Sequence, residues 1–212
     1  MKINKLPKTI SVFPLANAIF FPNTILPLNI FEERYIQLIS DCMKKEKLFG
    51  MVQPKLRSKT NPEVYKVGCL GKIVNFKETN DKRFIITLSG IIRFKIEKEL
   101  NSNKLYREFE VNYSNFTHDL NIVKIKKEKK DLMNFLNKLK IFFRKKNYFV
   151  QFDELEKLNF DQLLSTICMI APLSVEEKQK LIETSETEKK FKVLENIIDF
   201  NLVDNIQNST IQ

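Results

Sequence analysis

The sequence predicts an α+β fold, in which a β-rich N-terminal half with one short amphipathic helix precedes an all-helical C-terminal half. The apolar residues recur with a period of two between about residues 74 and 113, and with a period near 3.6 after about residue 116. The 212 residues include 43% hydrophobic residues, enough to bury a core. We expect a β-rich part at 1–118, a helical part at 119–204 and a polar tail at 205–212.

The stretch FPLANAIFFPNTILPLNIFEERY at residues 13–35 has no charged side chain before Glu32. Such a stretch can be a membrane span or an export signal, and a small-residue motif within it imitates a signal cleavage site. Prolines would interrupt the helix that either of these needs. They are Pro14, Pro22 and Pro27. The sequence instead predicts two short buried strands, at about 11–15 and 24–30, with proline turns between them.

An amphipathic helix is predicted directly after these strands. Its apolar residues follow Phe31 at helical spacing. They are Tyr35, Leu38, Ile39, Cys42 and Met43. Glutamates at 32–33 and lysines at 44–45 complement the helix dipole, and Gly50 closes the segment.

Alternating apolar residues then predict an antiparallel meander. They are Val74 and Phe76, then Phe84, Ile86 and Leu88, then Ile92, Phe94 and Ile96, and finally Leu105, Phe109, Val111 and Tyr113. Polar turns at 79–81 and 101–103 separate the strands. Arg107 is a charged member of the last apolar face, so we expect a barrel rim or a β-bulge there.

Four features of the sequence predict helices in the C-terminal half: one run of apolar residues at helical spacing and three helix N-termini. The first stripe is Leu132, Phe135, Leu136, Leu139, Phe142 and Phe143. A second helix starts near Asp161. Two capping boxes, Ser174 with Glu177 and Ser185 with Glu188, mark two further starts.

The chain is poor in residues that hold metals or transfer protons. Its cysteines, at positions 42, 69 and 168, match neither a disulfide framework nor a metal-binding spacing. We expect buried thiols in a reducing compartment, so a cytoplasmic location, and no metal or cofactor. The single histidine, His118, lies in a polar stretch where the two halves join, and we expect a solvated linker residue.

Motifs for catalysis are missing as well. Gly71-Lys72 has Lys66 where a Walker A loop needs its first glycine, and Ile73 where it needs Ser or Thr. Ser89-Gly90 has Thr87 where a nucleophile elbow needs glycine. The sequence therefore predicts a protein without catalytic residues that is not an enzyme.

Several stretches in the same order resemble the N-terminal domain of the Lon protease family, and most closely the short bacterial proteins that consist of this domain alone. Besides residues 13–35, which contain PLxIFExRY, they are GMVQP at 50–54, VGCLGKI at 67–73, RFIITLSGIIRFKI at 83–96 and APLSVEEKQKLIE at 171–183. The resemblance implies a twisted PUA-like β-barrel packed against a helical bundle. It also implies a non-catalytic role in binding proteins or peptides, for example as an adaptor in protein quality control.

Five residues are candidates for a peptide-binding groove. Phe20 and Phe21 point to opposite faces of an extended chain, so we expect one in the core and one exposed. Glu32 and Arg34 could hook a peptide, although a carboxylate in a first helical turn is ordinarily a capping partner. Met51 could line the same groove. The expected partners are unfolded or exposed apolar protein segments, together with a separate protease or chaperone, and no membrane.

The charge distribution suggests an alternative. Residues 122–147 hold ten Lys or Arg against two acidic residues, whereas residues 148–212 hold six Lys against twelve acidic residues. A basic helix on a PUA-like domain could bind RNA. The candidates are Lys126, Lys127, Lys130, Lys138, Arg144 and Lys145. A solvated helix face is the other interpretation, because lysine makes diffuse rather than bidentate phosphate contacts.

Overall fold

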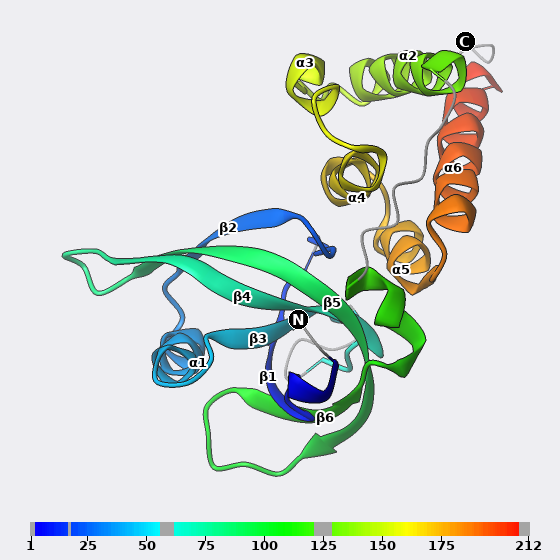
Figure 1. The fold of residues 1–212 in the computed structure, drawn as a ribbon. Helices are drawn as coiled ribbons and strands as arrows, with labels where there is room; N and C mark the ends of the chain where they lie inside the picture. The colour runs from blue at the N-terminus through cyan, green and yellow to red at the C-terminus, as the bar shows by residue number, and fades with distance from the viewer. Residues whose placement is uncertain (1–2, 17, 56–61, 121–128, 208–212) are drawn as a thin grey trace. The chain divides into compact units, whose positions relative to one another are not determined.

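The computed structural model describes residues 3–16, 18–55, 62–120 and 129–207 (Figure 1). The chain divides into two compact units, Met1–Ile122 and Val123–Gln212. The first unit contains the strands, and the second is helical. The elements of the first are η1 (Ile3–Lys5), β1 (Thr9–Pro14), β2 (Ile25–Ile30), α1 (Glu33–Met43), β3 (Leu48–Val52), β4 (Val67–Glu78), β5 (Phe84–Leu100), β6 (Arg107–Asn112) and η2 (Ser114–Leu120).

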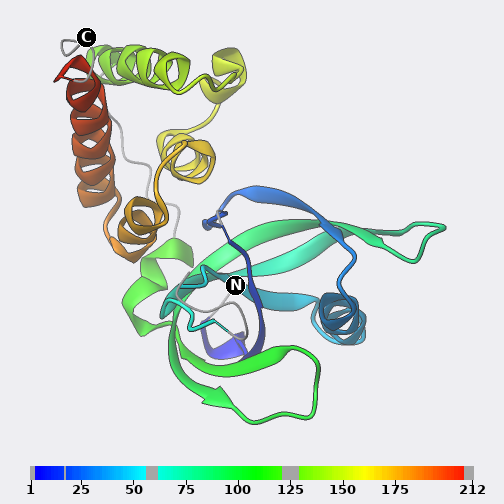
Figure 2. The same cartoon turned by 180° about the vertical axis from the view of Figure 1, so that it is seen from behind.

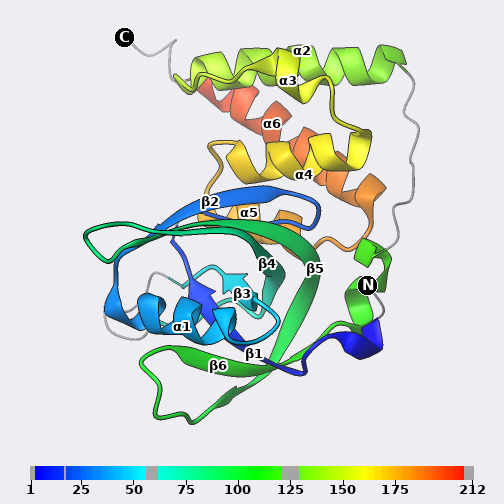
Figure 3. The same ribbon diagram turned by 60° about the vertical axis from the view of Figure 1, so that its left-hand side comes forward.

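The strands of the first unit form a six-stranded sheet in the order β2-β5-β4-β3-β1-β6. β1 and β3 are parallel, and the other pairs are antiparallel. The long strand β5 pairs with β2 through its first half and with β6 through its last residues, so the sheet curls round (Figure 3). The β4–β5 hairpin projects beyond the rest of the sheet (Figures 1 and 2).

The predicted α+β class is confirmed, but the sheet is curled with an open side rather than a closed barrel. The opening follows from β2, which pairs with β5 alone among the described residues. Pro27 lies in this edge strand opposite Thr87. A proline cannot donate to a ladder, so an edge strand is where it fits.

The core of the first unit lies within the curl of the sheet. It contains Leu6, Ile10, Val12, Val52, Val64, Leu70, Ile92, Phe94, Ile96, Phe109, Val111, Tyr113 and Phe116. The alternation predicted for β5 is confirmed, because Phe84, Ile86, Leu88, Ile92, Phe94 and Ile96 are all buried. The period of two therefore identified the inward face of this strand correctly.

Alternation failed in the neighbouring strands. Val74 is 51% exposed because it is the extra residue where the register shifts between Ile73 and Asn75. Phe76 pairs with the buried Ile86, but it lies in the projecting β4–β5 hairpin and is 39% exposed. The strand predicted at about 24–30 is present as β2, but it is not buried throughout as expected: Ile25 is 52% exposed, since an edge strand covers the core with one face only. Leu105 is 55% exposed because β6 begins two residues later, at Arg107.

The helix predicted after residue 31 is confirmed as α1, and its buried face is Tyr35, Leu38, Ile39 and Cys42. Gly50 does not close this segment as expected. It lies inside β3, where it pairs with Val12 of β1 and Leu70 of β4.

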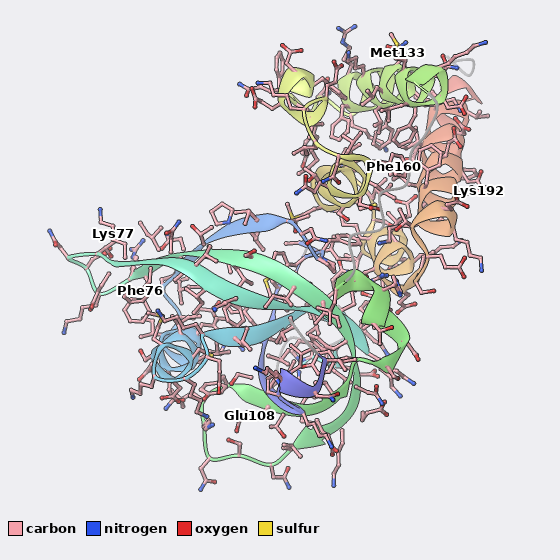
Figure 4. All side chains as sticks on the ribbon, in the orientation of Figure 1. Phe76, Lys77, Glu108, Met133, Phe160 and Lys192 are labelled. Atoms are coloured by element: carbon pink, nitrogen blue, oxygen red, sulfur yellow. The ribbon has the colours of Figure 1, made fainter. Side chains whose placement is uncertain are left out.

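The second unit contains α2 (Lys129–Lys145), α3 (Phe152–Leu155), α4 (Phe160–Ile170), α5 (Val175–Glu183) and α6 (Thr187–Gln207). Its aromatic rings pack at centroid distances of 4.8 Å for Phe135–Phe191 and 5.5 Å for Phe160–Phe191 (Figure 4). The capping box of Ser174 with Glu177 is confirmed, with both hydrogen bonds present.

A helix does begin near the second predicted capping box, and the capping hydrogen bonds of Ser185 with Glu188 stay a prediction. α6 begins at Thr187, and the Lys190 N–H donates to the Glu186 carbonyl. Glu186 therefore holds the cap position, and Ser185 lies one residue ahead of it.

The three cysteines are free and buried, as predicted. Burial raises the pKa of the Cys42 thiol from 9.0 to about 12, and its Sγ donates to the Leu48 carbonyl at 3.3 Å. The folded thiol thus resists ionisation between these two values, whereas the unfolded thiol ionises. The contribution of Cys42 to stability is therefore fully present below pH 9.0 and is lost as the pH rises towards 12.

We expect Cys42 in the native protein to react with iodoacetamide far more slowly than in urea, even at pH 10, because the thiolate is the reactive form. Mass spectrometry of the labelled peptide measures both rates. Equal rates in the native and the urea-unfolded protein would contradict the burial of this thiol.

Candidate functional site

Helix α1 lies beside the connection between β5 and β6, residues 101–106 (Figure 3). The Leu105 N–H donates to Gln37 Oε1 at 2.8 Å. The Tyr106 hydroxyl donates to the Asp41 carboxylate at 2.9 Å. These two bonds tie the connection to the helix, and Tyr106 lines two cavities.

The larger cavity has a volume of about 410 Å³, and we call it the α1–β6 groove. It is lined by Val12, Pro14, Arg34, Tyr35, Glu99, Leu100, Asn101, Ser102, Lys104, Leu105, Tyr106 and Arg107. Its volume falls within the range of ligand sites, roughly 300–1,000 Å³. The smaller cavity, of about 170 Å³, is lined by Asp41, Cys42 and their neighbours.

Ion pairs form the wall of the groove on the β5–β6 side. Arg107 binds both carboxylate oxygens of Glu99, at 2.6 and 2.7 Å, and donates to the Pro62 carbonyl at 2.9 Å. Lys104 Nζ donates to Glu108 at 2.7 Å, and this hydrogen bond raises the pKa of the lysine. Figure 4 labels Glu108 on β6.

The helix side of the groove is a stacked column. The Tyr35 ring stacks on Phe13 at a centroid distance of 3.9 Å, and the Arg34 guanidinium lies 4.5 Å from the centroid of Tyr35. The Tyr35 hydroxyl donates to the Pro14 carbonyl at 3.3 Å. Burial raises the pKa of this hydroxyl, so it remains protonated and can keep donating.

Of the five predicted peptide-binding residues, only Arg34 lines the groove. Its Nε and Nη2 donate to one oxygen of Glu32, at 3.0 and 2.7 Å. Glu32 occupies the cap position of α1, but its side chain makes no capping hydrogen bond. Its carboxylate therefore positions Arg34, a role that differs from the capping role expected.

The prediction that Phe20 or Phe21 is exposed is wrong. Their exposed fractions are 2% and 0%. Gly71 pairs with Gly90 in the β4–β5 ladder, and a Cβ atom on Gly90 would lie 2.0 Å from the Phe21 carbonyl oxygen. The segment before β2 therefore crosses the sheet in direct contact with it and buries both rings.

Met51 also lies in the core rather than in the groove. It is 3% exposed and belongs to β3, between β1 and β4. Successive residues of β3 point to opposite faces of the sheet and are buried from Phe49 to Val52, so both faces of this strand are covered.

Sequence reasoning missed Glu99, Lys104, Tyr106 and the connection that carries them. The signal that could have found them was Arg107, which interrupts an apolar alternation. Its guanidinium lies 5.0 Å from the Phe109 ring, with Glu99 on the adjacent strand β5. The bulge expected at Arg107 is not found there, because Arg107 pairs with Val12 of β1 without a register shift. The irregularity of the β5–β6 pair lies between Ile96 and Lys98, opposite Val111 and Glu110.

His118 is solvated in part, as expected, with 39% of its side chain exposed, but it is not a free linker residue. Its Nε2 lies 3.0 Å from Nη2 of Arg93, which is 1% exposed. The same guanidinium and the Arg93 backbone N–H bind the Asp119 carboxylate at 2.6 to 3.0 Å. His118 therefore belongs to a cluster that fastens η2 to β5.

A third cavity, of about 630 Å³, lies in the helical unit, along residues 140–154. Its apolar side includes Phe143 and Phe152, whose rings meet edge to face at 5.9 Å. Tyr148 is half exposed, and Phe149 is fully exposed. This cavity is a second candidate for contact with apolar segments.

The basic residues proposed to contact RNA differ in whether other residues of the chain already bind them. Lys126 and Lys127 lie outside the described residues. Lys138 pairs with Glu195 at 3.6 Å and with Asp199 at 3.0 Å, and the hydrogen bond to Asp199 raises its pKa. Lys145 donates to the Leu202 carbonyl at 3.1 Å.

Lys130 and Arg144 are exposed, and neither forms an ion pair with another described residue. Fewer of the six cations are thus available to phosphate than their number suggests. The RNA-binding hypothesis stays a prediction.

Metal-ligand clusters and membrane spans are both absent from the part of the chain that the structure describes. No group of three or more His, Cys, Asp and Glu side chains there is placed to hold a metal ion. No helix within the described ranges is long and apolar enough to span a membrane.

Comparison with solved structures shows the same fold. The Lon N-terminal domain protein from Xanthomonas campestris matches with a TM-score of 0.61 and 17% identity, over 88% of this chain and 96% of that one. The N-terminal domain of a Lon protease from the Mycobacterium avium complex matches with a TM-score of 0.61 and 14% identity, over 91% and 98%.

Curated relatives include the Lon proteases of Anaeromyxobacter dehalogenans and Syntrophus aciditrophicus. The first is 29% identical over 99 residues, which cover 44% of this chain and 12% of that protein. The second is 25% identical over 211 residues, which cover 95% of this chain and 26% of that protein. The chain thus spans about a quarter or less of the length of these relatives.

The sequence model of one family matches residues 9–199, which span most of both units. That family is described as the substrate-binding domain of the ATP-dependent protease La, or Lon. A match of this extent assigns the family, and the predicted resemblance is confirmed. The chain belongs to the Lon substrate-binding domain family.

Proposed function

We propose that this chain is a non-catalytic protein-binding module that holds extended segments of other proteins in the α1–β6 groove. In this role it acts as an adaptor in protein quality control and presents bound segments to a separate protease or chaperone. The groove, open to solvent and lined by residues from α1, β1 and the β5–β6 connection, is the observation that carries the proposal.

The construction of the groove supports binding rather than chemistry. Its charged groups, Glu99, Lys104 and Arg107, are held by partners within hydrogen-bond distance, and Tyr35 is fixed by a stack and a hydrogen bond. Fixed walls lower the entropy lost when a flexible segment binds. Membership of a family described as substrate-binding supports the same role.

The proposal can be tested by site-specific cross-linking. A photoreactive benzoylphenylalanine replaces Leu105, which lines the groove and is 55% exposed. The matched control replaces Ile141 of α2, which is 51% exposed and lines neither the groove nor the other two cavities. The client is a reduced, carboxamidomethylated protein, which stays unfolded, and its native form serves as the folded counterpart.

We expect the unfolded client to cross-link at position 105 several times more than at position 141, and the folded client at neither. A third probe at Phe149 reports on the cavity of the helical unit. Cross-links at position 149 without any at position 105 would overturn the placement in the groove. Absence of cross-links at all three positions would overturn the proposed function.

A further inference from the structure

We propose that the α1–β6 groove selects extended segments that carry a side-chain carboxylate, from an aspartate or glutamate. This inference rests on the proposed function and adds the chemistry that the site prefers. It follows from which charged groups of the groove have unused hydrogen-bonding capacity.

The cations of the groove have donors to spare. Arg34 donates through Nε and Nη2 to Glu32, and Nη1 has no partner among the described residues. Lys104 donates one Nζ hydrogen to Glu108 and also interacts with Tyr106, so at least one of its three hydrogens remains for another acceptor. The side chains of Arg34 and Lys104 are 51% and 34% exposed, so an incoming group can reach both.

The charge of the groove's carboxylate is already offset by a bound cation. Glu99 is the acidic residue that lines it, and Arg107 occupies both of its oxygens in a bidentate pair. A lysine or arginine of a bound segment would therefore compete with a fixed guanidinium. An incoming carboxylate, in contrast, meets unfilled donors on Arg34 and Lys104, and charge-assisted bonds of this type are strong.

Arg34 is also held in place before any ligand arrives. Glu32 binds it from one side, and its guanidinium lies 4.5 Å from the centroid of the Tyr35 ring, which is stacked on Phe13. A guanidinium fixed in this way loses little freedom when it accepts a second anion. The groove thus presents an ordered cation together with the apolar surface of Pro14 and Leu105.

The test uses four labelled peptides with amidated C-termini and one shared sequence of Leu, Phe, Ser and Gly. The central residue is Asp, Glu, Asn or Lys, and binding to the full chain is measured by fluorescence anisotropy. We expect the Asp and Glu peptides to bind about fivefold more tightly than the Asn peptide, and the Lys peptide most weakly. The acidic preference should shrink at high salt.

The double variant Arg34→Gln with Lys104→Gln should remove the preference, so that the Asp and Asn peptides bind equally. The matched control, Lys72→Gln with Lys77→Gln, removes the same charge from exposed positions of β4 outside the groove and should keep it (Figure 4). Equal binding of Asp and Asn peptides by the unmodified chain would overturn the inference and leave the proposed function standing. Failure of every peptide to bind would overturn both.

Discussion

Substitution of Gly90 by alanine is expected to destabilise the strand-rich unit by about 4 kcal/mol or more. The new Cβ atom would lie 2.0 Å from the Phe21 carbonyl oxygen and 3.1 Å from Pro22 Cα. Both are backbone atoms, so no side-chain rotation relieves the overlap. The segment before β2 would have to leave the sheet.

Leaving the sheet would break two hydrogen bonds, Asn23 N–H to the Gly90 carbonyl and Gly90 N–H to the Thr24 carbonyl, at 3.0 and 2.9 Å. It would also expose the rings of Phe20 and Phe21, each of which contributes roughly 1.5–3 kcal/mol when buried. The expected loss is therefore large compared with the whole stability of a domain, about 5–15 kcal/mol.

Urea unfolding followed by far-UV circular dichroism measures this loss, and hydrogen exchange of β4 and β5 locates it. Ser89→Ala is the matched control, since Ser89 is the neighbouring residue, half-buried rather than buried. We expect that control to change stability by less than about 0.5 kcal/mol. An unchanged midpoint for Gly90→Ala would show that the segment does not cross the sheet at this glycine.

Substitution of Asp119 by asparagine is expected to cost about 3–5 kcal/mol, because it leaves a buried guanidinium without its counter-charge. Arg93 and Asp119 have side-chain exposed fractions of 1% and 7%, and their shortest contact is 2.6 Å. The Arg93 guanidinium lies 4.7 Å from the Phe116 ring, and its Nη2 lies near His118. Neither contact supplies a negative charge.

Glu32→Gln is the matched control, because it also turns a carboxylate into an amide but breaks an exposed pair. Exposed pairs contribute about 0–1 kcal/mol, so a small effect is expected. A second variant, Arg93→Met combined with Asp119→Asn, removes the unpaired charge and keeps an amide oxygen for the backbone N–H at position 93. We expect it to recover part of the loss in urea unfolding.

If Asp119→Asn proved no more harmful than Glu32→Gln, the cluster would not be a buried pair in solution. If it were harmful but Arg93→Met gave no recovery, the loss would come from hydrogen bonds rather than from the isolated charge. Either result would contradict the role of Asp119 as the counter-charge of a buried guanidinium.

Local sequence patterns predicted the structure correctly where that structure depends on neighbouring residues alone. The amphipathic spacing of α1, the inward face of β5 and the Ser174 capping box all depend on contacts within a few residues or on a single period. The sequence also predicted the family, because several stretches along the chain resemble those of Lon N-terminal domains and occur in the same order.

Contacts between segments that are distant in the sequence could not be predicted from it. The burial of Phe20, Phe21 and Met51 depends on which distant segments of the chain cover them. His118 contacts Arg93, which lies 25 positions earlier in the chain. The residues that line the groove likewise come from α1 and from the β5–β6 connection, which only the curl of the sheet brings together.

The sequence by itself determined the α+β class, the helices with strong caps or stripes and the family. The tertiary structure alone decided which residues reach solvent and which charges face one another. The physical reason is that periodicity is set by local geometry, whereas exposure and ion pairing are set by distant chain segments that occupy the same space.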